Sequence, residues 1–450
     1  MAQTADPARA IAALTPLKIL IVAEKEATLT EDVGRSFVTA IQRAFQGGLT
    51  EAPDGSEKYY SVGDELGVEV QTLHWVPKKN PNLDSPAPSI AEGARTVADA
   101  ATAAFDNRVE ERLTAERLLA SCGHLFVVAL LKDAPAAEGK FGQWLDRVAT
   151  DALRPDHENR IGLLPVALDT QSEDVRLGQF NEFQRLPVSD LGEHALRAGY
   201  LGLLVLQRAW SLLTKDADGR MKLFISHAKK DGAAIALAMK AQILSLRWLQ
   251  PFYDACDILP GAPWRRVLRN GVRDSAIVVL RTDIYEQRPW CVQEIQWAEE
   301  FGCPSVVVDL RAASTMPRES LPVAGMVTVT IYDGNLIRIL NAALREAMRV
   351  RLFRRTIELL EKAGVVDQRK VVTVPRPSIS TMGLVFERFL QDPPQNGCDE
   401  QGKKRTITPD EVEWVVTPEP FRESLRAPAE RLVAAYFKNA KLVNPRDITF

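Results

Sequence analysis

Met221-Lys-Leu-Phe-Ile-Ser-His227 opens the stretch that decides the fold of this chain, and Cys303-Pro-Ser-Val-Val-Val-Asp309 closes it. Between them, short apolar runs end in polar or glycine-bearing residues, and a segment of helix length follows each run. Alternating strand and helix signals of this kind predict a parallel sheet. Ligands bind such a sheet outside the carboxyl ends of its strands. The residues expected at that edge are Ser226, Asp254, Asp257 and Gly261, with Glu294 on a nearby helix.

The bulk composition is that of an ordinary folded protein, with 46% apolar and 26% charged residues. A chain of 450 residues exceeds what one hydrophobic core usually supports, so two or three domains are expected. A formal net charge of -3 gives no reason to expect nucleic acid or an anionic membrane as a direct partner. The five cysteines are odd in number and widely scattered, which favours a reducing cytoplasm over a disulfide framework.

No targeting or membrane segment is expected from the sequence. The N-terminus has no basic segment followed by an apolar one, which argues against a secretory signal. The most apolar long stretch, residues 200–213, contains Gln207 and Arg208 and is too short to cross a bilayer. It is predicted to be a buried helix.

Residues 1–216 are predicted to form an α/β domain. Apolar runs of strand length stand at residues 17–23, 68–75, 124–131 and 161–168. The Ala-rich, amphipathic residues 91–121 predict a helix, in one or two pieces. Alternation of this kind predicts a doubly wound sheet. The charged hexapeptide Lys215-Asp-Ala-Asp-Gly-Arg220 then marks the domain boundary.

Residues 221–350 are predicted to form a five-stranded sheet with its helices. The expected strands are residues 222–226, 251–253, 276–280, 305–309 and 327–331. The expected helices are residues 231–249, 263–274 and 289–301, followed by a long basic helix over residues 335–364. In the first helix, Leu237, Ala241, Leu244 and Trp248 recur at helical spacing, which predicts that they form its buried face.

Residues 351–450 are predicted to hold the end of the long helix and a partial third α/β domain. Residues 370–374 have the pattern of a strand, and residues 427–438 have that of an amphipathic helix with Pro428 in its first turn. Prolines at 375, 377, 393 and 394 surround polar text, and residues 391–404 are expected to be mobile.

Four blocks of the central stretch carry a specific pattern. In order, they are Leu223-Phe-Ile-Ser-His-Ala-Lys-Lys-Asp231, then Phe252-Tyr-Asp254 with Asp257-Ile-Leu-Pro-Gly261 and Trp264, then Ser275-Ala-Ile-Val-Val-Leu280, then Tyr285 with Trp290-Cys-Val-Gln-Glu294. Together they resemble the Toll/interleukin-1 receptor (TIR) domain family, and its bacterial members most closely. The resemblance covers about a quarter of the chain. It implies a flavodoxin-like five-stranded parallel sheet and self-association through the loop after the second strand.

In its enzymatic members, this family cleaves NAD+ at the nicotinamide-ribose bond with a glutamate in a Trp-x-x-x-Glu pattern, which matches Trp290 and Glu294. Breaking that bond releases a neutral leaving group, so one carboxylate suffices to stabilise positive charge on the ribosyl carbon. Because residues four apart on a helix share a face, Trp290 is expected to place an aromatic plane beside the carboxylate. NAD+ is therefore expected as a substrate, and no cofactor is expected.

The expected binding residues are Phe224, Ser226, Asp231, Asp254, Asp257 and Trp290. The turn from Ser226 to Gly232 supplies a hydroxyl, two lysines and a helix N-terminus, which favour an anion such as a pyrophosphate. The chain has no Gly-x-Gly-x-x-Gly and no Walker-type Gly-Lys-Ser, so these frameworks for hydride transfer and ATP hydrolysis are not indicated. No cluster of His, Cys and carboxylates has metal-ligand spacing, so no metal is expected.

Each of these residues also has a purely structural interpretation. A glutamate on an amphipathic helix is usually solvated, and a tryptophan is usually part of a core. The corresponding structural roles are a strand end for Ser226, a helix cap for Asp231 and a turn for Asp254 and Asp257.

Two functions of different classes remain open. The first is a cytoplasmic bacterial enzyme that, once assembled, cleaves NAD+ to nicotinamide and ADP-ribose or a cyclic isomer, as an effector in antiphage defence. The second is a non-enzymatic scaffold whose TIR domain recruits other TIR domains. In either case, a protein or a nucleotide messenger bound by the flanking domains is a possible activator. In the first domain, Val148 rather than glutamate stands four residues after Trp144, so this domain is expected to be a degenerate relative that senses, inhibits or assembles.

Overall fold

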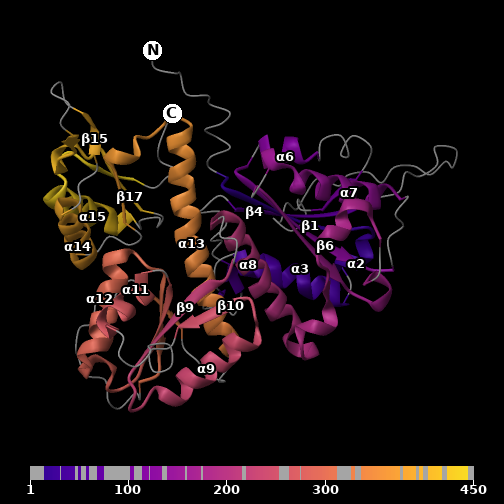
Figure 1. Cartoon of the computed structure of the whole chain (residues 1–450), viewed down its shortest axis with the longest axis horizontal. Helices are drawn as coiled ribbons and strands as arrows, with labels where there is room; N and C mark the ends of the chain where they lie inside the picture. The colour runs from indigo at the N-terminus through magenta and orange to yellow at the C-terminus, as the bar shows by residue number, and fades with distance from the viewer. Residues whose placement is uncertain are drawn as a thin grey trace. The chain divides into compact units, whose positions relative to one another are not determined.

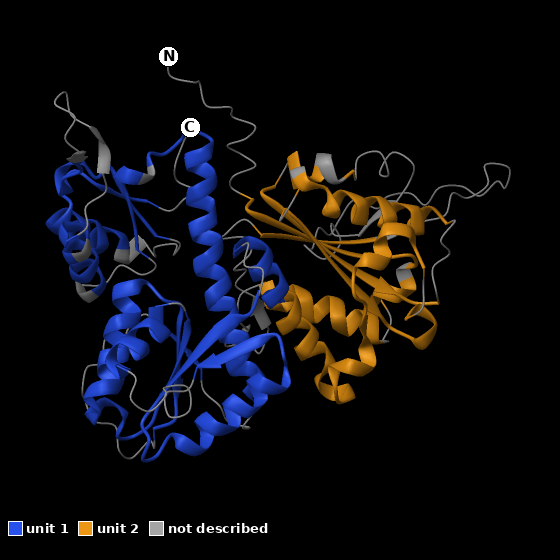
Figure 2. Ribbon diagram, in the orientation of Figure 1, with its two compact units in different colours: residues 1–14, 206–450 blue, residues 15–205 orange. Residues whose placement is uncertain are grey.

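A computed structural model divides the chain into two compact units, residues 15–205 and residues 206–450 with 1–14 (Figure 2). The structure describes residues 15–30, 32–45, 49–51, 57–59, 68–75, 102–105, 114–120, 122–133, 139–157, 160–173, 176–214, 219–252, 263–273, 275–311, 326–329, 336–374, 379–391, 395–398, 404–417 and 423–443.

The N-terminal unit is built on a six-stranded parallel sheet in the order β5-β4-β1-β6-β7-β8 (Figure 1). Its strands are β1 (Leu17–Ala23), β4 (Val68–Trp75), β5 (Thr102–Phe105), β6 (His124–Leu131), β7 (Ile161–Ala167) and β8 (Leu186–Pro187). Strands β1 and β6 are buried along their whole length, which explains their nearly continuous apolar sequences. A separate hairpin pairs β2 (Leu49–Glu51) with β3 (Glu57–Tyr59).

Helices pack closely around this sheet. They are α2 (Glu26–Thr30), α3 (Asp32–Phe45), α6 (Ala115–Ala120), α7 (Lys140–Leu153), α8 (Arg197–Thr214), and the 3-10 turns η1 (Pro155–His157), η2 (Thr170–Ser172), η3 (Gly178–Glu182), η4 (Val188–Leu191) and η5 (His194–Leu196). Side chains of β1 and β6, such as Leu20 and Val127, share one core with α6 and α7. Helix α8 passes close to α3. The short distance is clear at Gly202, where a Cβ atom would lie only 3.2 Å from the carbonyl oxygen of Ala40.

One expectation for this unit is wrong. The sequence predicts a helix over residues 91–121, whereas the structure has strand β5 at residues 102–105 and a helix, α6, only from Ala115. Strand β5 pairs with residues 72–75 of β4. The interstrand hydrogen bonds outweigh the helix propensity of the alanines in β5. The other residues between 91 and 113 lie outside the described residues.

Cys122, just before β6, makes the stability of this unit depend on pH. The thiol is buried and donates to the carbonyl oxygen of Leu118 at 3.1 Å. Burial raises the pKa of Cys122 from 9.0 to about 11. The folded unit therefore keeps a proton that the unfolded chain loses above pH 9, so its free energy of unfolding falls as the pH rises from 9 towards 11. We expect this group to contribute a fall of about 2–3 kcal/mol.

Denaturant unfolding of the wild type and of Cys122→Ala at pH 8 and at pH 11 measures this contribution, because other groups titrate equally in both chains. The stability loss between the two pH values is expected to be smaller in Cys122→Ala. An equal loss in both chains would contradict the assignment.

The central domain, in the second unit, is built on a five-stranded parallel sheet in the order β10-β9-β11-β12-β13 (Figure 1). Its strands are β9 (Met221–His227), β10 (Leu249–Phe252), β11 (Ala276–Arg281), β12 (Ser305–Asp309) and β13 (Val327–Val329). The first strand lies between the second and the third, which is the flavodoxin-like order. The predicted fold class is therefore confirmed.

The helices of the central domain cover this sheet. They are α9 (Ala233–Ser245), α11 (Trp264–Arg273), the 3-10 turn η6 (Tyr285–Gln287), α12 (Pro289–Phe301) and α13 (Leu336–Lys362). Helices α11 and α12 share a core with Phe224, Ile277 and Val279 of the sheet. Helix α13 packs against β11, β12 and β13, and α9 packs against β9 and β10. Helix α12 starts at a proline and ends at Gly302, whose positive φ of 61° suits a residue without a Cβ.

The predicted buried face of α9 is wrong. The structure buries Ala236, Met239 and Ile243, whereas Leu237 and Leu244 are 51% and 55% exposed. Apolar residues occur on all sides of this helix, so their periodicity does not single out one face. Leu237 and Leu244 thus form an exposed apolar face, which we call the α9 face.

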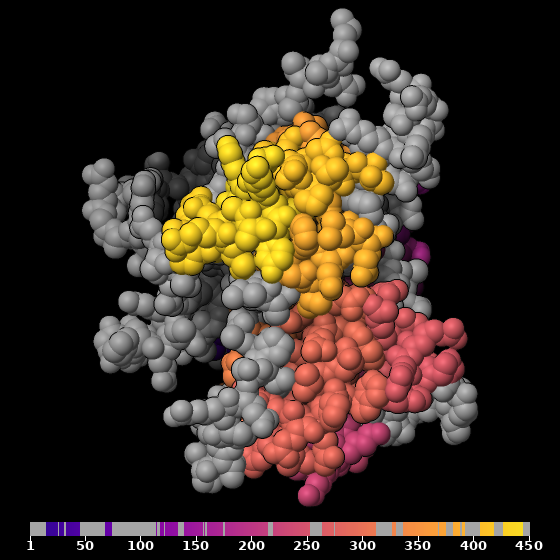
Figure 3. Space-filling view, turned by 90° about the vertical axis from the view of Figure 1, so that its left-hand side faces the viewer, coloured from indigo at the N-terminus to yellow at the C-terminus, as the bar shows by residue number. Residues whose placement is uncertain are grey.

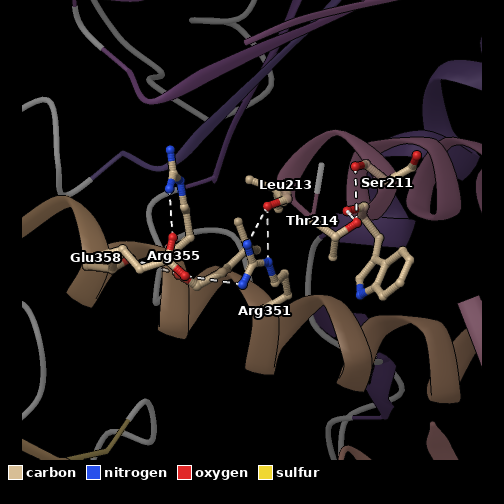
Figure 4. A network of polar contacts seen from close by, with 9 residues as sticks. Ser211, Leu213, Thr214, Arg351, Arg355 and Glu358 are labelled. Carbon is tan, nitrogen blue, oxygen red and sulfur yellow. Dashed lines mark hydrogen bonds and ion pairs between the residues drawn. The ribbon is translucent and has the colours of Figure 1, made fainter. Parts of the chain in front are cut away.

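Arginines of α13 bind the carboxyl ends of two other helices. The Nη2 and Nε atoms of Arg351 donate to the carbonyl oxygen of Leu213, in the last turn of α8, at 2.5 and 3.1 Å (Figure 4). Glu358 joins Arg351 to Arg355 in the same network. Arg354 donates to the carbonyl oxygen of Gly302 at the end of α12, at 3.1 Å. Cations are favourable there because the last carbonyls of a helix carry negative partial charge.

The C-terminal region is a small α/β arrangement, as the sequence predicts. Its last helix begins at Glu423, four residues before the predicted start, so Pro428 lies inside the helix and not in its first turn. Its parallel sheet has the order β14-β17-β18. The elements are η7 (Gln368–Lys370), β14 (Val371–Thr373), α14 (Ile379–Gln391), β15 (Gln395–Cys398), β16 (Lys404–Thr406), η8 (Pro409–Glu411), β17 (Trp414–Val416), α15 (Glu423–Tyr436) and β18 (Lys441–Val443). Helix α14 packs against α12, and Figure 3 shows the yellow and orange C-terminal residues beside the salmon central domain.

The N-terminal sheet follows the same plan as the central sheet. With the edge strand β5 set aside, the order β4-β1-β6-β7-β8 matches β10-β9-β11-β12-β13 strand for strand. In each of these orders the first strand lies between the second and the third, and the fourth and fifth strands follow beyond the third. The two sheets therefore differ mainly in the extra edge strand and in the residues at their carboxyl ends.

Candidate functional site

The carboxyl edge of the central sheet brings together Ser226 from β9 and Glu294 from α12. Glu294 lies on the buried stripe of α12, with Cys291, Ile295 and Ala298. This spacing of three and four residues turns its side chain towards the sheet. The hydroxyl of Ser226 donates a hydrogen bond to Oε2 of Glu294. A carboxylate thus occupies a core position of the helix, where the residue is only 6% exposed.

Tyr285, from the turn after β11, extends this contact. Its hydroxyl is hydrogen-bonded to Oγ of Ser226 and lies 3.4 Å from the carbonyl oxygen of Cys291. A serine hydroxyl has one proton, and this one is donated to Glu294, so Tyr285 donates to Ser226. The resulting chain, from Tyr285 through Ser226 to Glu294, fixes one carboxylate oxygen, and its bonds reinforce one another away from water. We call these three residues the edge cluster.

Burial keeps Tyr285 of the edge cluster protonated. Tyr285 is fully buried, and its pKa is raised well above the ordinary value, first by burial and then by the negative charge of Glu294. The hydrogen bond between Tyr285 and Ser226 acts on this pKa in the opposite direction. The phenol therefore stays protonated at physiological pH and remains a hydrogen-bond donor.

Asp231 ties two loops of this edge together. Its carboxylate accepts from the hydroxyl of Thr282 at 2.7 Å and from the backbone N–H of Ile284 at 3.4 Å. Thr282 and Ile284 belong to the loop that delivers Tyr285. Asp231 is not the cap of the following helix, because the N-cap residue of α9 is Gly232. Asp231 thus positions the loop, and its direct contact with a ligand stays a prediction.

Trp290 and Glu294 differ in exposure. Trp290 is 38% exposed, and its ring meets that of Trp264 edge-on at 4.3 Å between centroids. The guanidinium of Arg265 lies 5.2 Å from the Trp290 ring. Residues four apart on a helix differ by only about 40° around the axis, so the expected position of the indole beside the carboxylate stays a prediction.

The other predicted site residues lie elsewhere. Phe224 is 1% exposed and stacks on Phe252 at 5.1 Å between ring centroids, so it belongs to the core beneath the edge and not to a ligand surface. This corrects its predicted binding role. Asp254 and Asp257 lie outside the described residues. Cys291 is buried, and its thiol donates to the carbonyl oxygen of His227 at 3.5 Å.

Two arginine–carboxylate pairs at the same edge were not predicted from the sequence. Arg281, at the end of β11, binds Glu286. Arg311 binds Asp309, at the end of β12, through two hydrogen bonds of 2.6 and 2.9 Å. The guanidinium of Arg311 lowers the pKa of Asp309. Both carboxylates are thus held by arginines, whereas a neutral hydroxyl holds Oε2 of Glu294. The sequence does show charged residues at the ends of these strands. It does not show which arginine pairs with which carboxylate.

The strand order and the edge cluster agree with the plan implied by the sequence blocks. Residues 223–334 match the family of TIR domains. These residues form a TIR domain. The match covers about a quarter of the 450 residues, so it identifies this domain and not the whole chain.

Other comparisons add little to this identification. No curated protein matches the chain. Among solved structures, the crystal structure of tagatose-6-phosphate ketose/aldose isomerase from Escherichia coli is similar at 10% identity, over 74% of this chain and 82% of that one, with a TM-score of 0.17. A score this low carries no argument about fold or function. Within the described residues, no helix is long and apolar enough to span a membrane, and no three metal-ligating side chains gather.

The N-terminal unit has apolar residues at the places that match the edge cluster of the TIR domain. Val22 is the sixth residue of β1, as Ser226 is of β9. Val148 follows Trp144 by four residues on α7, as Glu294 follows Trp290 on α12. Val22, Trp144 and Val148 belong to one apolar core. A sensing, inhibiting or assembling role for this unit stays a prediction.

Removing the hydroxyl of Tyr285 tests the hydrogen-bond chain. In Tyr285→Phe the ring still fills its place, but Ser226 loses its donor and is less firmly held on Glu294. A hydrogen bond of this kind contributes about 1 kcal/mol, so we expect a fall of similar size in the free energy of unfolding of Tyr285→Phe. Denaturant unfolding measures this change. Tyr436→Phe, in α15, is the matched control and should lower the free energy of unfolding less.

Proposed function

We propose that the TIR domain cleaves NAD+ at the nicotinamide-ribose bond, with Glu294 as the catalytic carboxylate. The observation that carries this proposal is the placement of Glu294 on the buried stripe of α12, held by Ser226 at the carboxyl edge of the sheet. A carboxylate in such a position costs stability, and groups of this kind are found most often at functional sites. The matching helix of the N-terminal unit, α7, has apolar residues throughout its buried stripe.

The chemistry requires one fixed negative charge. In the proposed reaction, the bond between the ribosyl carbon and the pyridinium nitrogen breaks, and its electron pair goes to nicotinamide, which leaves as a neutral molecule. The ribosyl carbon becomes positive, and the carboxylate of Glu294 stabilises that charge. Water then adds to the carbon and releases a proton, giving ADP-ribose. Attack by an adenine nitrogen of the same molecule, in place of water, gives a cyclic isomer.

Other residues of this edge support binding in the proposal. The turn after β9 carries the exposed residues Lys229 and Lys230 next to the start of α9, which suits the pyrophosphate of NAD+. Asp231 holds the loop that delivers Tyr285. The proposal rests on the carboxylate of Glu294 and does not require the nicotinamide to stack on Trp290.

The setting of the reaction is also proposed. Resemblance to bacterial TIR proteins favours a cytoplasmic enzyme that acts after self-association, as an effector of antiphage defence. In this proposal, the loop after β10 of one copy completes the site of a neighbouring copy. Turnover would then depend on protein concentration. A protein or a nucleotide messenger is the proposed activator.

A second candidate function, a scaffold without enzymatic activity, is favoured by the α9 face. Leu237 and Leu244 together leave a large apolar surface on a helix that is apolar on all sides. Exposed apolar surface of this kind is often a contact site for another protein. A scaffold would assemble through such contacts without consuming NAD+.

Chromatography of NAD+ incubated with the full chain over a series of protein concentrations separates the two functions. The enzyme is expected to release nicotinamide in equal amount to the NAD+ consumed, with a rate that rises more than proportionally with protein concentration. Assembly measured in the same samples, with NAD+ left intact, would contradict the enzyme and support the scaffold.

A further inference from the structure

Helix α11 carries an unusual concentration of positive charge. Its sequence, Trp264-Arg-Arg-Val-Leu-Arg-Asn-Gly-Val-Arg273, contains four arginines and no acidic residue. Arg265, Arg269 and Arg273 recur every four residues and lie along one side of the helix, which we call the arginine stripe. A four-residue step rises about 6 Å along the axis, so the guanidinium groups are spread over about 12 Å. Arg266 is exposed beside the stripe.

Aromatic rings lie directly beneath this stripe. The guanidinium of Arg265 lies 5.7 Å from the Trp264 ring and 5.2 Å from the Trp290 ring. Those of Arg269 and Arg273 lie 5.2 and 4.7 Å from the ring of Phe301. A ring attracts a cation without neutralising its charge. Glu300 forms an ion pair with Arg269. Within the part of the chain that the structure describes, no carboxylate pairs with Arg265 or Arg273, so their charges stay available to an anion.

The two indoles remain open to solvent. Trp264 is 40% exposed and Trp290 is 38% exposed, and the two rings meet edge-on. Indoles are normally buried more deeply, since each offers a large apolar area. Here two indoles lie side by side at one end of the arginine stripe. The indoles offer surfaces on which bases can stack, and the guanidinium groups offer charges that can bind phosphates. Figure 3 is turned so that the side of the molecule carrying α11 and α12 faces the viewer.

We propose that the arginine stripe, with Trp264 and Trp290, binds single-stranded nucleic acid. Guanidinium groups bind phosphates through paired hydrogen bonds, and indoles stack on unpaired bases, which every single strand offers. Acidic peptides and anionic membranes supply the charge but no planar bases, so they would leave the indoles without a partner. The net charge of -3 does not oppose this, because it averages a basic helix with acidic residues elsewhere. The site is distinct from the edge cluster, and binding there needs no cleavage of NAD+.

Fluorescence anisotropy of a labelled oligothymidine of about 12 nucleotides, titrated with the full chain, tests the proposal. We expect saturable binding that weakens as salt rises. Arg265→Gln combined with Arg266→Gln and Arg273→Gln should weaken binding at least ~10-fold and make the salt slope shallower by about 2, since each phosphate contact contributes about 0.7. Arg269 is left in place because it pairs with Glu300. Lys222→Gln combined with Arg338→Gln and Lys362→Gln, which changes the net charge equally at exposed positions away from α11, should keep the wild-type affinity.

Trp264→Ala separates stacking from charge. It should weaken binding at least ~5-fold without changing the salt slope. Thermal unfolding checks that each variant is folded as the wild type is. Absence of binding, equal weakening by the control triple variant, or wild-type affinity in Trp264→Ala would each overturn the proposal. The proposal would also be overturned if polyglutamate competed as effectively as unlabelled oligothymidine, because negative charge alone would then suffice for binding. None of these outcomes bears on NAD+ cleavage by Glu294.

Discussion

Glu294→Gln is expected to abolish NAD+ cleavage while the TIR domain stays folded. The substitution keeps the shape of the side chain and an oxygen that can accept from Ser226, but it removes the negative charge. Loss of one group that stabilises charge in a transition state commonly lowers kcat by about 10²–10³-fold. We expect at least this loss in nicotinamide release, measured by chromatography at saturating NAD+. Stability should change little or rise, because a buried charge is removed.

Glu299→Gln is the matched control, since it makes the same chemical change one to two turns further along α12. It is expected to keep wild-type turnover. Turnover by Glu294→Gln within a few fold of the wild type would remove Glu294 from the mechanism. Equal loss in both variants would show that the helix, and not the carboxylate, had been disturbed.

Val148→Glu is expected to destabilise the N-terminal unit severely. Val148 is 2% exposed and lies in an apolar core with Trp144 and Val22. Where Ser226 donates a hydrogen bond to Glu294 in the TIR domain, the N-terminal unit has Val22, which has no hydroxyl to donate. An isolated carboxylate cannot stay charged there. Protonating a carboxyl of ordinary pKa at pH 7 alone requires about 4 kcal/mol, and misfit of the longer side chain adds to it. A loss of this size approaches the whole stability of many domains.

Gln143→Glu, at an exposed position of the same helix, introduces the same charge and should change the free energy of unfolding by less than about 0.5 kcal/mol. Denaturant unfolding of both variants measures the difference. The instability of Val148→Glu should also lessen as the pH is lowered towards 4, since the carboxyl is then neutral in the unfolded chain as well. A Val148→Glu chain as stable as Gln143→Glu would mean that this position can hydrate a carboxylate.

The strands of the central sheet were predictable because each is an apolar run of strand length followed by a helical segment. Strands β9, β11 and β12 lie within a residue of their predicted bounds, and helix α12 has the predicted bounds. The family resemblance pointed to Glu294. Sequence spacing also explains why Glu294 faces the sheet, since it falls in register with Cys291 and Ile295.

Other features depend on tertiary contacts that spacing does not encode. Strand β5 forms because β4 offers an edge to its alanines, and the face of α9 is chosen by packing among apolar residues on every side. The role of Asp231 depends on a loop about fifty residues later in the chain. Tyr285 stood in the sequence blocks, but only its burial against Ser226 shows that it belongs to the edge cluster.

Proton NMR of NAD+ mixed with the wild-type chain, at concentrations where it assembles, most directly tests whether the edge cluster is a catalytic site. The nicotinamide-ring signals of NAD+ should be replaced over time by those of free nicotinamide, through many turnovers per chain. Unchanged NAD+ signals in a sample shown to be folded and assembled would contradict the proposed enzyme.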